Sequence, residues 1–213
     1  MEGSNYKEEI AEILIDIQSI KFSFQNPFIL TSGLKSPVYV DCRKIISFVK
    51  ERNIILNYTK NYFDKNQIKF DLLAGGETAG IPYAAFLAER LNKPMIYIRK
   101  KAKGFGKRSQ IEGDFQNNQK GILIEDLATD GKSKAIFINA MRDNNLEIKD
   151  TFVIFYYGIF KEEELNLKKL GIEIHYLCTW HHVLNQIKKD KILENKNIES
   201  IEKFLFEPDK WEK

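Results

Sequence analysis

From Phe70 onward the sequence alternates short apolar runs with longer stretches of helical spacing, and this alternation constrains the fold most. Alternation of this kind is typical of strand–helix–strand units, which build a mostly parallel sheet. The apolar runs are uninterrupted, which predicts strands buried on both faces. The predicted strands are Phe70–Gly76, Pro94–Lys100, Lys120–Asp126, Asp150–Phe160 and Gly171–Trp180. The predicted helices are Ile81–Asn92, Gly131–Asn144 and a polar helix between the last two strands.

The segments outside this alternation are also predicted to be regular. Ile10, Ile13, Leu14 and Ile17 recur at helical spacing near the N-terminus, where Asn5 and Glu8 suit a helix cap. Pro37–Arg43 is expected to form a short strand, Ser47 to about Phe63 a helix, and the lysine- and asparagine-rich chain after Trp180 further helix. A length of 213 residues suits one domain with an elaboration.

Composition narrows the choice of ligand and compartment. The net charge of +3 is too small to argue for nucleic acid, and it suits an anionic small molecule. Two cysteines, Cys42 and Cys178, lie far apart with no CxxC or Cys/His cluster, so a reduced intracellular protein without a zinc site is expected. The first residues do not resemble a signal peptide, and no apolar run approaches the length of a membrane span. We therefore expect a cytoplasmic protein.

Three unusual segments follow predicted strands: GGETAG (Gly75–Gly80), RKKAKGFGKRSQIEG (Arg99–Gly113) and EDLATDGKS (Glu125–Ser133). Ligands in an open α/β sheet bind at the carboxyl ends of the strands. We therefore expect the three segments to lie close together and to form one site.

The segment Glu125–Ser133 combines two adjacent acids with a phosphate-binding turn. Backbone N–H groups at the turn, with the Thr129 and Ser133 hydroxyls, suit a phosphate monoester. Acids repel phosphate, so the pair Glu125–Asp126 makes sense if the ligand also offers hydroxyls, a metal or developing positive charge, as a sugar phosphate does. The alternative is a solvated turn with capping acids. Neither a Walker A loop nor a Rossmann GxGxxG turn is present.

The other segments carry weaker signals. Gly104 and Gly106 lie in a cationic stretch, which suits a lid over a polyanion. A solvated surface and a nucleic-acid interface are the alternatives, although Phe105 is its sole aromatic. Gly75–Gly80 allows close backbone approach to an anion, and Phe28–Arg43 offers polar groups that suit a planar heterocycle with a carboxylate. The cations of the stretch are Arg99, Lys100, Lys101, Lys103, Lys107 and Arg108.

These four segments, in this order, resemble the orotate phosphoribosyltransferase family. ILIEDLATDGKS is similar to the phosphoribosyl-pyrophosphate (PRPP) motif of type I phosphoribosyltransferases, and TSGLKSPVYVDCR to the N-terminal signature of the orotate branch. The resemblance spans roughly Phe28 to Trp180. It implies a parallel sheet with helices on both faces and a hood built from the N-terminal segment. It also implies transfer of the phosphoribosyl group from PRPP to orotate, giving orotidine 5'-monophosphate and pyrophosphate in pyrimidine biosynthesis.

The resemblance also implies roles for individual residues. Glu125 and Asp126 would hold the ribose hydroxyls, and Lys100 would serve the site of a partner subunit. The implied catalytic residues are Lys103, Arg99 and Asp126. The implied PRPP-binding residues are Arg99, Lys100, Lys103, Lys107, Glu125, Asp126, Leu127, Ala128, Thr129, Asp130, Gly131, Lys132 and Ser133. The implied pyrophosphate loop is Gly75, Gly76, Glu77, Thr78, Ala79 and Gly80, and the implied orotate-binding residues are Thr129, Ser36, Tyr39 and Arg43.

Cofactor, assembly and domain expectations follow from the same resemblance. Mg²⁺ would be held mainly by PRPP and water, with no direct protein ligand, and a homodimer with shared active sites is expected, without nucleic acid or membrane partners. One phosphoribosyltransferase domain would span residues 1–213, with a helix and hood in 1–45, an α/β core in about 65–180 and a helical segment in 181–213.

Several residues depart from the family pattern. Phe105 replaces a loop histidine, and Ala79 and Thr31 replace lysines that one branch carries. Asp130 puts a third acid inside the phosphate turn, and its side chain is expected to point away from the ligand. The alternatives are a purine-type phosphoribosyltransferase, against which TSGLKSPVYVDCR argues, and a non-enzymatic PRPP-sensing regulator, which would need a DNA-binding module.

Overall fold

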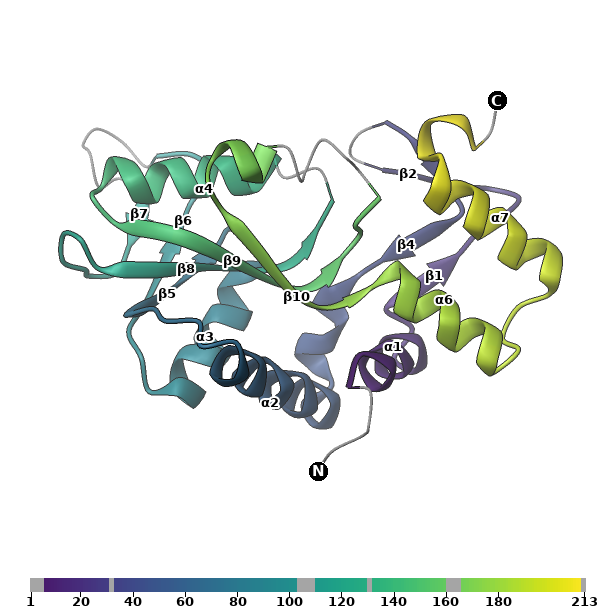
Figure 1. Cartoon of the computed structure of the whole chain (residues 1–213), viewed down its shortest axis with the longest axis horizontal. Helices are drawn as coiled ribbons and strands as arrows, with labels where there is room; N and C mark the ends of the chain where they lie inside the picture. The colour runs from purple at the N-terminus through teal and green to yellow at the C-terminus, as the bar shows by residue number, and fades with distance from the viewer. Residues whose placement is uncertain (1–5, 31–32, 103–109, 130–131, 160–165, 212–213) are drawn as a thin grey trace.

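A central six-stranded sheet organises the computed structural model, which describes residues 6–30, 33–102, 110–129, 132–159 and 166–211 (Figure 1). The strand order is β10-β9-β8-β5-β6-β7, and every neighbouring pair is parallel except the antiparallel pair β6–β7. The predicted mostly parallel sheet is therefore confirmed. Its strands are β5 (Leu72–Gly76), β6 (Met95–Ile98), β7 (Ile111–Glu112), β8 (Lys120–Ala128), β9 (Glu147–Tyr156) and β10 (Glu173–Thr179).

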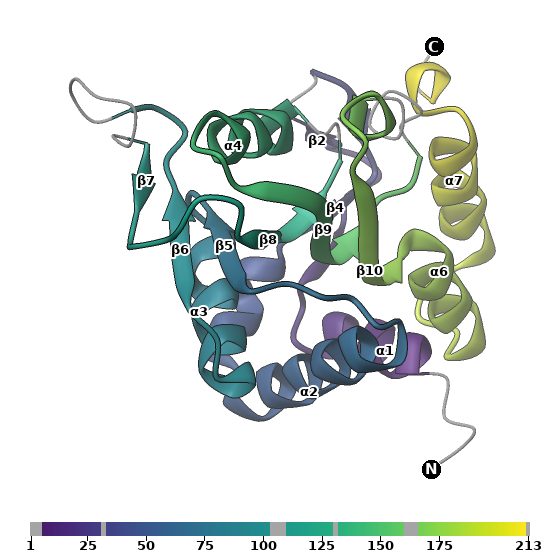
Figure 2. The ribbon, with the colours of Figure 1, turned by 60° about the vertical axis from the view of Figure 1, so that its left-hand side comes forward.

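Helices cover both faces of this sheet. On one face lie α1 (Tyr6–Asp16), α2 (Val49–Lys65) and α3 (Gly80–Leu91), and on the other lies α4 (Lys132–Asp143) (Figures 1 and 2). Two separate apolar clusters result, one on each side of the sheet. The central strand β8 is buried from Gly121 to Asp126, as its uninterrupted apolar sequence predicts.

The N-terminal segment forms small antiparallel pairs beside the sheet. β1 (Ile20–Phe22) pairs with β4 (Val38–Val40), and β2 (Phe28–Ile29) pairs with β3 (Lys35–Ser36). The predicted strand Pro37–Arg43 was too long, because the chain turns into the 3-10 helix η1 (Cys42–Ser47) once β4 runs out of partner residues on β1. This segment is the hood that the resemblance implies.

The chain after the sheet is helical. It contains α6 (Trp180–Lys189), α7 (Asn195–Phe206) and the 3-10 helix η2 (Pro208–Lys210). The polar helix predicted between β9 and β10 falls partly on residues 160–165, outside the described residues, and residues 166–169 are helical. Within the part of the chain that the structure describes, no helix combines the length and the apolar character that a membrane span requires.

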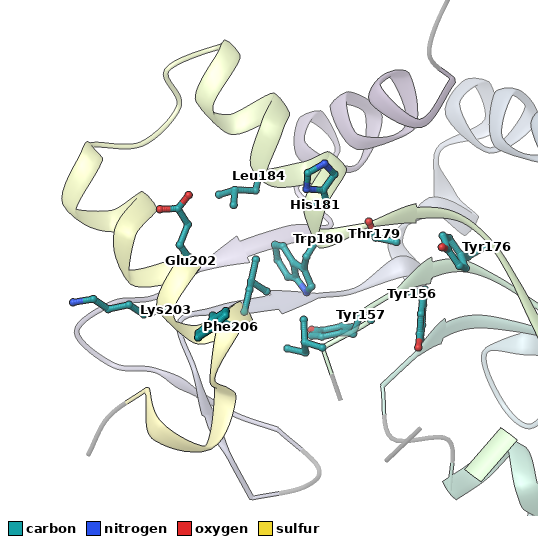
Figure 3. Close-up of a pocket in the computed structure, with 13 residues that line it drawn as sticks. Tyr156, Tyr157, Tyr176, Thr179, Trp180, His181, Leu184, Glu202, Lys203 and Phe206 are labelled. Carbon is teal, nitrogen blue, oxygen red and sulfur yellow. The ribbon is translucent and has the colours of Figure 1, made fainter. Parts of the chain in front are cut away.

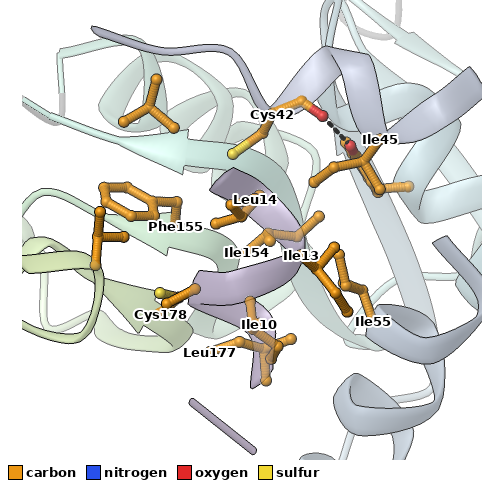
Figure 4. Packing of buried hydrophobic residues seen from close by; sticks show 14 of the residues in the cluster. Ile10, Ile13, Leu14, Cys42, Ile45, Ile55, Ile154, Phe155, Leu177 and Cys178 are labelled. Atoms are coloured by element: carbon orange, nitrogen blue, oxygen red, sulfur yellow. Dashed lines mark hydrogen bonds between the residues drawn. The ribbon is translucent and has the colours of Figure 1, made fainter. Parts of the chain in front are cut away.

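The helix α1 joins the hood to the sheet. Its apolar stripe, which includes Ile10 and Leu14, belongs to the same buried cluster as Leu177 of β10, Phe155 of β9 and Ile45 of η1 (Figure 4). Each of these side chains is almost completely buried, and burial of one such side chain contributes roughly 1.5–3 kcal/mol. The hood is therefore packed on the sheet as part of one core. Cys42 and Cys178 are buried in that core as free thiols.

Candidate functional site

The acid pair lies inside the last part of β8, two residues before the strand ends at Ala128. Successive side chains of a strand point to opposite faces. Glu125 and Asp126 therefore reach different sides of the sheet, and each is less than 10% exposed. Two buried carboxylates at the carboxyl end of a central strand are costly, so their surroundings decide what the site can do.

Glu125 points toward the loop between β5 and α3. A Cβ atom built on Gly76 would lie 2.1 Å from Glu125 Oε1, and one on Gly80 would lie 2.6 Å from it. Glycine at both positions therefore makes room for the carboxyl group. The pKa of Glu125 is raised to about 7, mainly by burial and also by the negative charge of Asp126, against the opposing effect of Lys134 and Lys100. Glu125 Oε1 is buried and has no hydrogen-bond partner among the described residues.

Asp126 points toward the hood side of the sheet. Burial raises the pKa of its carboxyl group, and hydrogen bonds from the backbone N–H groups of Leu127 and Asp126 itself lower it, as do the charges of Lys134 and Arg43. Burial raises the pKa of Cys42 and Tyr83, and the negative charge of Asp126 raises both further. The Tyr83 hydroxyl donates to Cys42 O at 2.5 Å, linking α3 to η1 beside the acid.

Lys134 is a site residue that sequence reasoning missed. It lies on α4, is 2% exposed, and donates from Nζ to Leu127 O at 3.1 Å. Its charge lowers the pKa of both Glu125 and Asp126. A signal was available, because Lys134 begins the apolar stripe that continues with Phe137, Ile138 and Met141 at helical spacing. A lysine on the buried face of a helix requires a partner, and here the partners are the strand end and its acids.

Two hydrogen bonds join the glycine loop Gly75–Gly80 to the end of β6. Glu77 N donates to Ile98 O at 2.9 Å, and Glu77 Oε2 accepts from Lys100 N at 2.7 Å. The peptide bond between Glu77 and Thr78 is cis. Together with the contact between Glu125 and the two glycines, these bonds confirm that the ends of β5, β6 and β8 converge.

Only some of the cationic residues that follow β6 lie in the part of the chain that the structure describes. Arg99 Nε donates to Glu112 Oε1 at 2.9 Å, so the β6–β7 pair holds this guanidinium beside the site. Lys100 is exposed, and its charge lowers the pKa of Glu125 in the same chain. Lys103, Phe105 and Lys107 lie outside the described residues, as do Thr31 and Asp130.

Three of the predicted orotate-binding residues come from the hood, with Ser36 on β3, Tyr39 on β4 and Arg43 on η1, and Thr129 follows β8. Tyr39 packs on Phe28 with ring centroids 5.5 Å apart, and Arg43 donates from Nε to Asp41 Oδ1 at 2.7 Å and from NH2 to the Tyr39 hydroxyl at 3.3 Å. Ser36 is fully buried, and its hydroxyl donates to Val38 O at 2.7 Å. The hood therefore presents Tyr39 and Arg43, whereas the Ser36 hydroxyl closes a local turn.

The phosphate turn is described only at its edges. Leu127 and Thr129 are half-buried and Ala128 is buried, and α4 begins at Lys132 directly after the turn. Gly131 lies outside the described residues, and only the backbone of Lys132 and Ser133 is described. A helix that starts directly behind the acid pair places its N-terminal N–H groups at the site, as the sequence predicts.

A separate cavity lies between β9, β10 and the C-terminal helices, and its volume is about 730 Å³ (Figure 3). Aromatic side chains line much of it, among them Tyr156, Tyr157, Tyr176, Trp180 and Phe206. None of the described residues predicted to bind substrate lines this cavity. The strand-end constellation and the cavity are therefore distinct features.

Comparison with known proteins decides the family. The chain is 43% identical over 211 residues to the orotate phosphoribosyltransferase of Ruegeria sp. (strain TM1040), covering 96% of this chain and 93% of that protein. It is 43% identical over 204 residues to the enzyme of Roseobacter denitrificans, covering 95% and 91%. The chain belongs to the orotate phosphoribosyltransferase family. No family model matches its sequence.

Solved structures agree with this membership. The fold of this orotate phosphoribosyltransferase family member is similar to that of orotate phosphoribosyltransferase from Aeropyrum pernix, with a TM-score of 0.73 and 26% identity, covering 84% of this chain and 99% of that one. Leishmania donovani UMP synthase gives a TM-score of 0.78 and 26% identity, covering 93% of this chain and 42% of that longer chain. The type I phosphoribosyltransferase fold, with helices on both faces of the sheet, is confirmed.

Proposed function

We propose that this protein transfers the 5-phosphoribosyl group from PRPP to orotate, giving orotidine 5'-monophosphate and pyrophosphate in pyrimidine biosynthesis. The observation that carries the proposal is the buried pair Glu125–Asp126, with Glu125 set against the glycine loop Gly75–Gly80 and with α4 beginning after the short turn that follows the pair. Membership in the orotate phosphoribosyltransferase family supports the choice of orotate as the acceptor.

The residue types match the charges of such a reaction. Orotate N1 forms a bond to the anomeric carbon while the bond from that carbon to the pyrophosphate oxygen breaks. Positive charge develops on the ribose and negative charge on pyrophosphate. Glu125 and Asp126 accept hydrogen bonds from the ribose hydroxyls and oppose the positive charge, which is stabilisation aimed at the transition state. Glu125 Oε1, which has no hydrogen-bond partner among the described residues, supplies one acceptor for this purpose.

Cations and backbone groups hold the anionic parts of the substrate. The turn Leu127–Ser133 wraps the 5'-phosphate, the loop Gly75–Gly80 approaches pyrophosphate with its backbone, and Arg99, Lys100 and Lys103 neutralise the leaving group. Arg99 is already positioned by Glu112, so little ordering of its side chain is required. Thr129, Tyr39 and Arg43 lie on the side where orotate enters, with Ser36 supporting the hood turn.

Magnesium fits this arrangement as a partner of the substrate. Hard divalent cations prefer oxygen ligands, and Mg²⁺ keeps several waters. The buried carboxylate oxygens of Glu125 and Asp126 suit hydrogen bonds to ribose hydroxyls or to such waters, so the ion is held mainly by PRPP. When bound, Mg²⁺ neutralises the charge on pyrophosphate. The protein works as a cytoplasmic homodimer in which Lys100 and the loop after it serve the partner's site.

The direct test is substrate consumption. Purified protein with Mg²⁺ and PRPP is expected to lower the absorbance of orotate, and PRPP with adenine or hypoxanthine is expected to give no turnover. Turnover of a purine base without turnover of orotate would assign the protein to the purine branch. Absence of turnover with all three bases, despite PRPP binding, would favour a PRPP-sensing regulator.

A further inference from the structure

A second polar cluster lies on β9 and β10, nearer the amino ends of these strands than the acid pair is. Asp150 on β9 lies opposite Glu173 in the parallel register of β10, and His175 follows two residues later on the same face as Glu173. One ligand atom from each of these three residues lies within 4.8 Å of the others. Glu125 of the acid pair lies opposite Val153 of β9, so at about 3.3 Å per residue Asp150 is roughly 10 Å along β9 from the level of the acid pair.

The charges of this cluster are unbalanced. Carboxylates directly opposite each other on neighbouring strands repel. Among the ion pairs between described residues, neither Asp150 nor Glu173 pairs with a lysine or arginine, and His175 is the only partner of Asp150. A cation bound between the two acids would remove this repulsion.

The histidine is arranged as a metal ligand of this type requires. His175 is 6% exposed, and its Nε2 lies 2.8 Å from Asp150 Oδ1. Its other ring nitrogen, Nδ1, lies 3.3 Å from the Tyr62 hydroxyl of α2, whose ring packs edge-on against the imidazole at 5.9 Å. Ligating histidines usually have their second nitrogen hydrogen-bonded, which fixes the ring and the tautomer. Tyr62 therefore holds the ring through Nδ1, while Nε2 faces Asp150.

We propose that Asp150, Glu173 and His175 bind a divalent transition-metal ion of the zinc class. Bonds of about 2.0–2.2 Å in a tetrahedral site place neighbouring ligand atoms about 3.3 Å apart. The Nε2 and Oδ1 atoms need to separate only slightly from 2.8 Å, and the exposed Glu173 carboxylate closes from within 4.8 Å. Water supplies the fourth ligand. A mixed imidazole and carboxylate set favours zinc-class ions over Mg²⁺, which prefers oxygen alone.

Binding moves one proton within the His175 ring. Without metal, Nε2–H donates to Asp150 and Nδ1 accepts from the Tyr62 hydroxyl. With metal, Nε2 binds the ion and the single ring proton is carried by Nδ1, which donates to the Tyr62 oxygen, so the neutral imidazole neither gains nor loses a proton overall. The bound ion would tie the edge strand β10 to β9 and, through Tyr62, to α2. Its expected consequence is a more stable sheet edge, with no part in the transfer reaction.

Titration of the metal-stripped protein with zinc chloride tests the proposal. Calorimetry should show one tight equivalent, and zinc should raise the melting temperature. H175N and E173Q should each weaken zinc binding by roughly tenfold or more, and Y62F should weaken it by about tenfold through the outer shell. Cobalt(II) in place of zinc should give the visible absorption of a tetrahedral site, which E173Q removes.

The chain offers a matched control. Its other two histidines, His181 and His182, are neighbours whose rings lie 5.8 Å apart, so they form the competing surface site. The double variant H181N/H182N should bind zinc as tightly as the parent. Loss of binding in that variant, retention in both E173Q and H175N, or no binding by the parent protein would overturn the proposal. Glu173 is exposed, so E173Q should fold and turn over orotate normally even if H175N does not fold.

Discussion

The ionisation of Glu125 should make the stability of the protein fall as the pH rises. The residue is 7% exposed, its pKa is raised from 4.5 to about 7 mainly by burial, and its Oε1 has no partner among the described residues. Replacement by glutamine keeps the shape of the protonated acid and removes its ionisation. E125Q therefore isolates the contribution of this one group.

The size of the effect follows from the pKa change. Because the pKa is higher in the folded state, the folded protein holds the proton more tightly than the unfolded chain does. The resulting stabilisation is complete below pH 4.5 and is lost as the pH rises through 7. At 1.4 kcal/mol per pH unit, the loss amounts to about 3 kcal/mol. The free energy of unfolding of E125Q minus that of the parent is the quantity to compare. This difference should be about 3 kcal/mol larger at pH 8 than at pH 4.5.

Urea denaturation without ligand at a series of pH values measures this difference. E89Q, which changes an exposed glutamate on α3, is the control and should follow the parent at every pH. If the gap between E125Q and the parent stays constant with pH, or narrows as pH rises, Glu125 is not the buried, poorly solvated acid described above.

Three further substitutions test the site. K134M removes the buried cation that lowers the pKa of both acids, so the pH at which kcat/KM for PRPP rises should move upward relative to the parent, as a pH–rate profile would show. G76A places a Cβ 2.1 Å from Glu125 Oε1, so it should destabilise the fold by about 1–3 kcal/mol in urea denaturation and weaken PRPP binding in calorimetry. K103A should lower kcat by about 100-fold or more with little change in PRPP affinity. The neighbouring variant K101A is the control and should keep a rate near that of the parent. Similar rates for the two variants would show that Lys103 does not have the proposed role in the lid.

Much of the fold could be predicted because local pattern and tertiary environment agree. The apolar run Lys120–Asp126 is a buried central strand, and the helices after Gly80 and after the phosphate turn begin within one residue of prediction. The predicted strand Pro37–Arg43 exists as β4 but ends earlier than predicted, because its end depends on β1, a three-residue partner from elsewhere in the chain. Strand ends set by pairing cannot be read from the residues of one strand alone.

The types of residue at the site could be predicted from the sequence, but the directions in which their side chains point could not. The sequence shows that Glu125 and Asp126 are adjacent, but not that one faces the glycine loop and the other faces the hood. It shows Ser36 as a free hydroxyl, whereas the structure gives that hydroxyl a backbone acceptor two residues away. The cluster of Asp150, Glu173 and His175 was missed for a related reason. Its members come from two strands, β9 and β10, and the His175 ring contacts Tyr62 of a third element, α2.

Glu125 Oε1, which has no hydrogen-bond partner in the part of the chain that the structure describes, connects stability with function. A buried acceptor without a partner costs about 1–3 kcal/mol, so packing alone does not favour its presence. Gly76 and Gly80 make room for the carboxyl group, and the buried Lys134 favours its ionised form. These residues therefore accommodate a carboxylate at this buried position. A ribose hydroxyl that donates to Glu125 Oε1 would supply the missing bond and favour the carboxylate further. The carboxyl group of Glu125 thus destabilises the free protein. In the proposed complex, the same group accepts a hydrogen bond that only the ligand supplies.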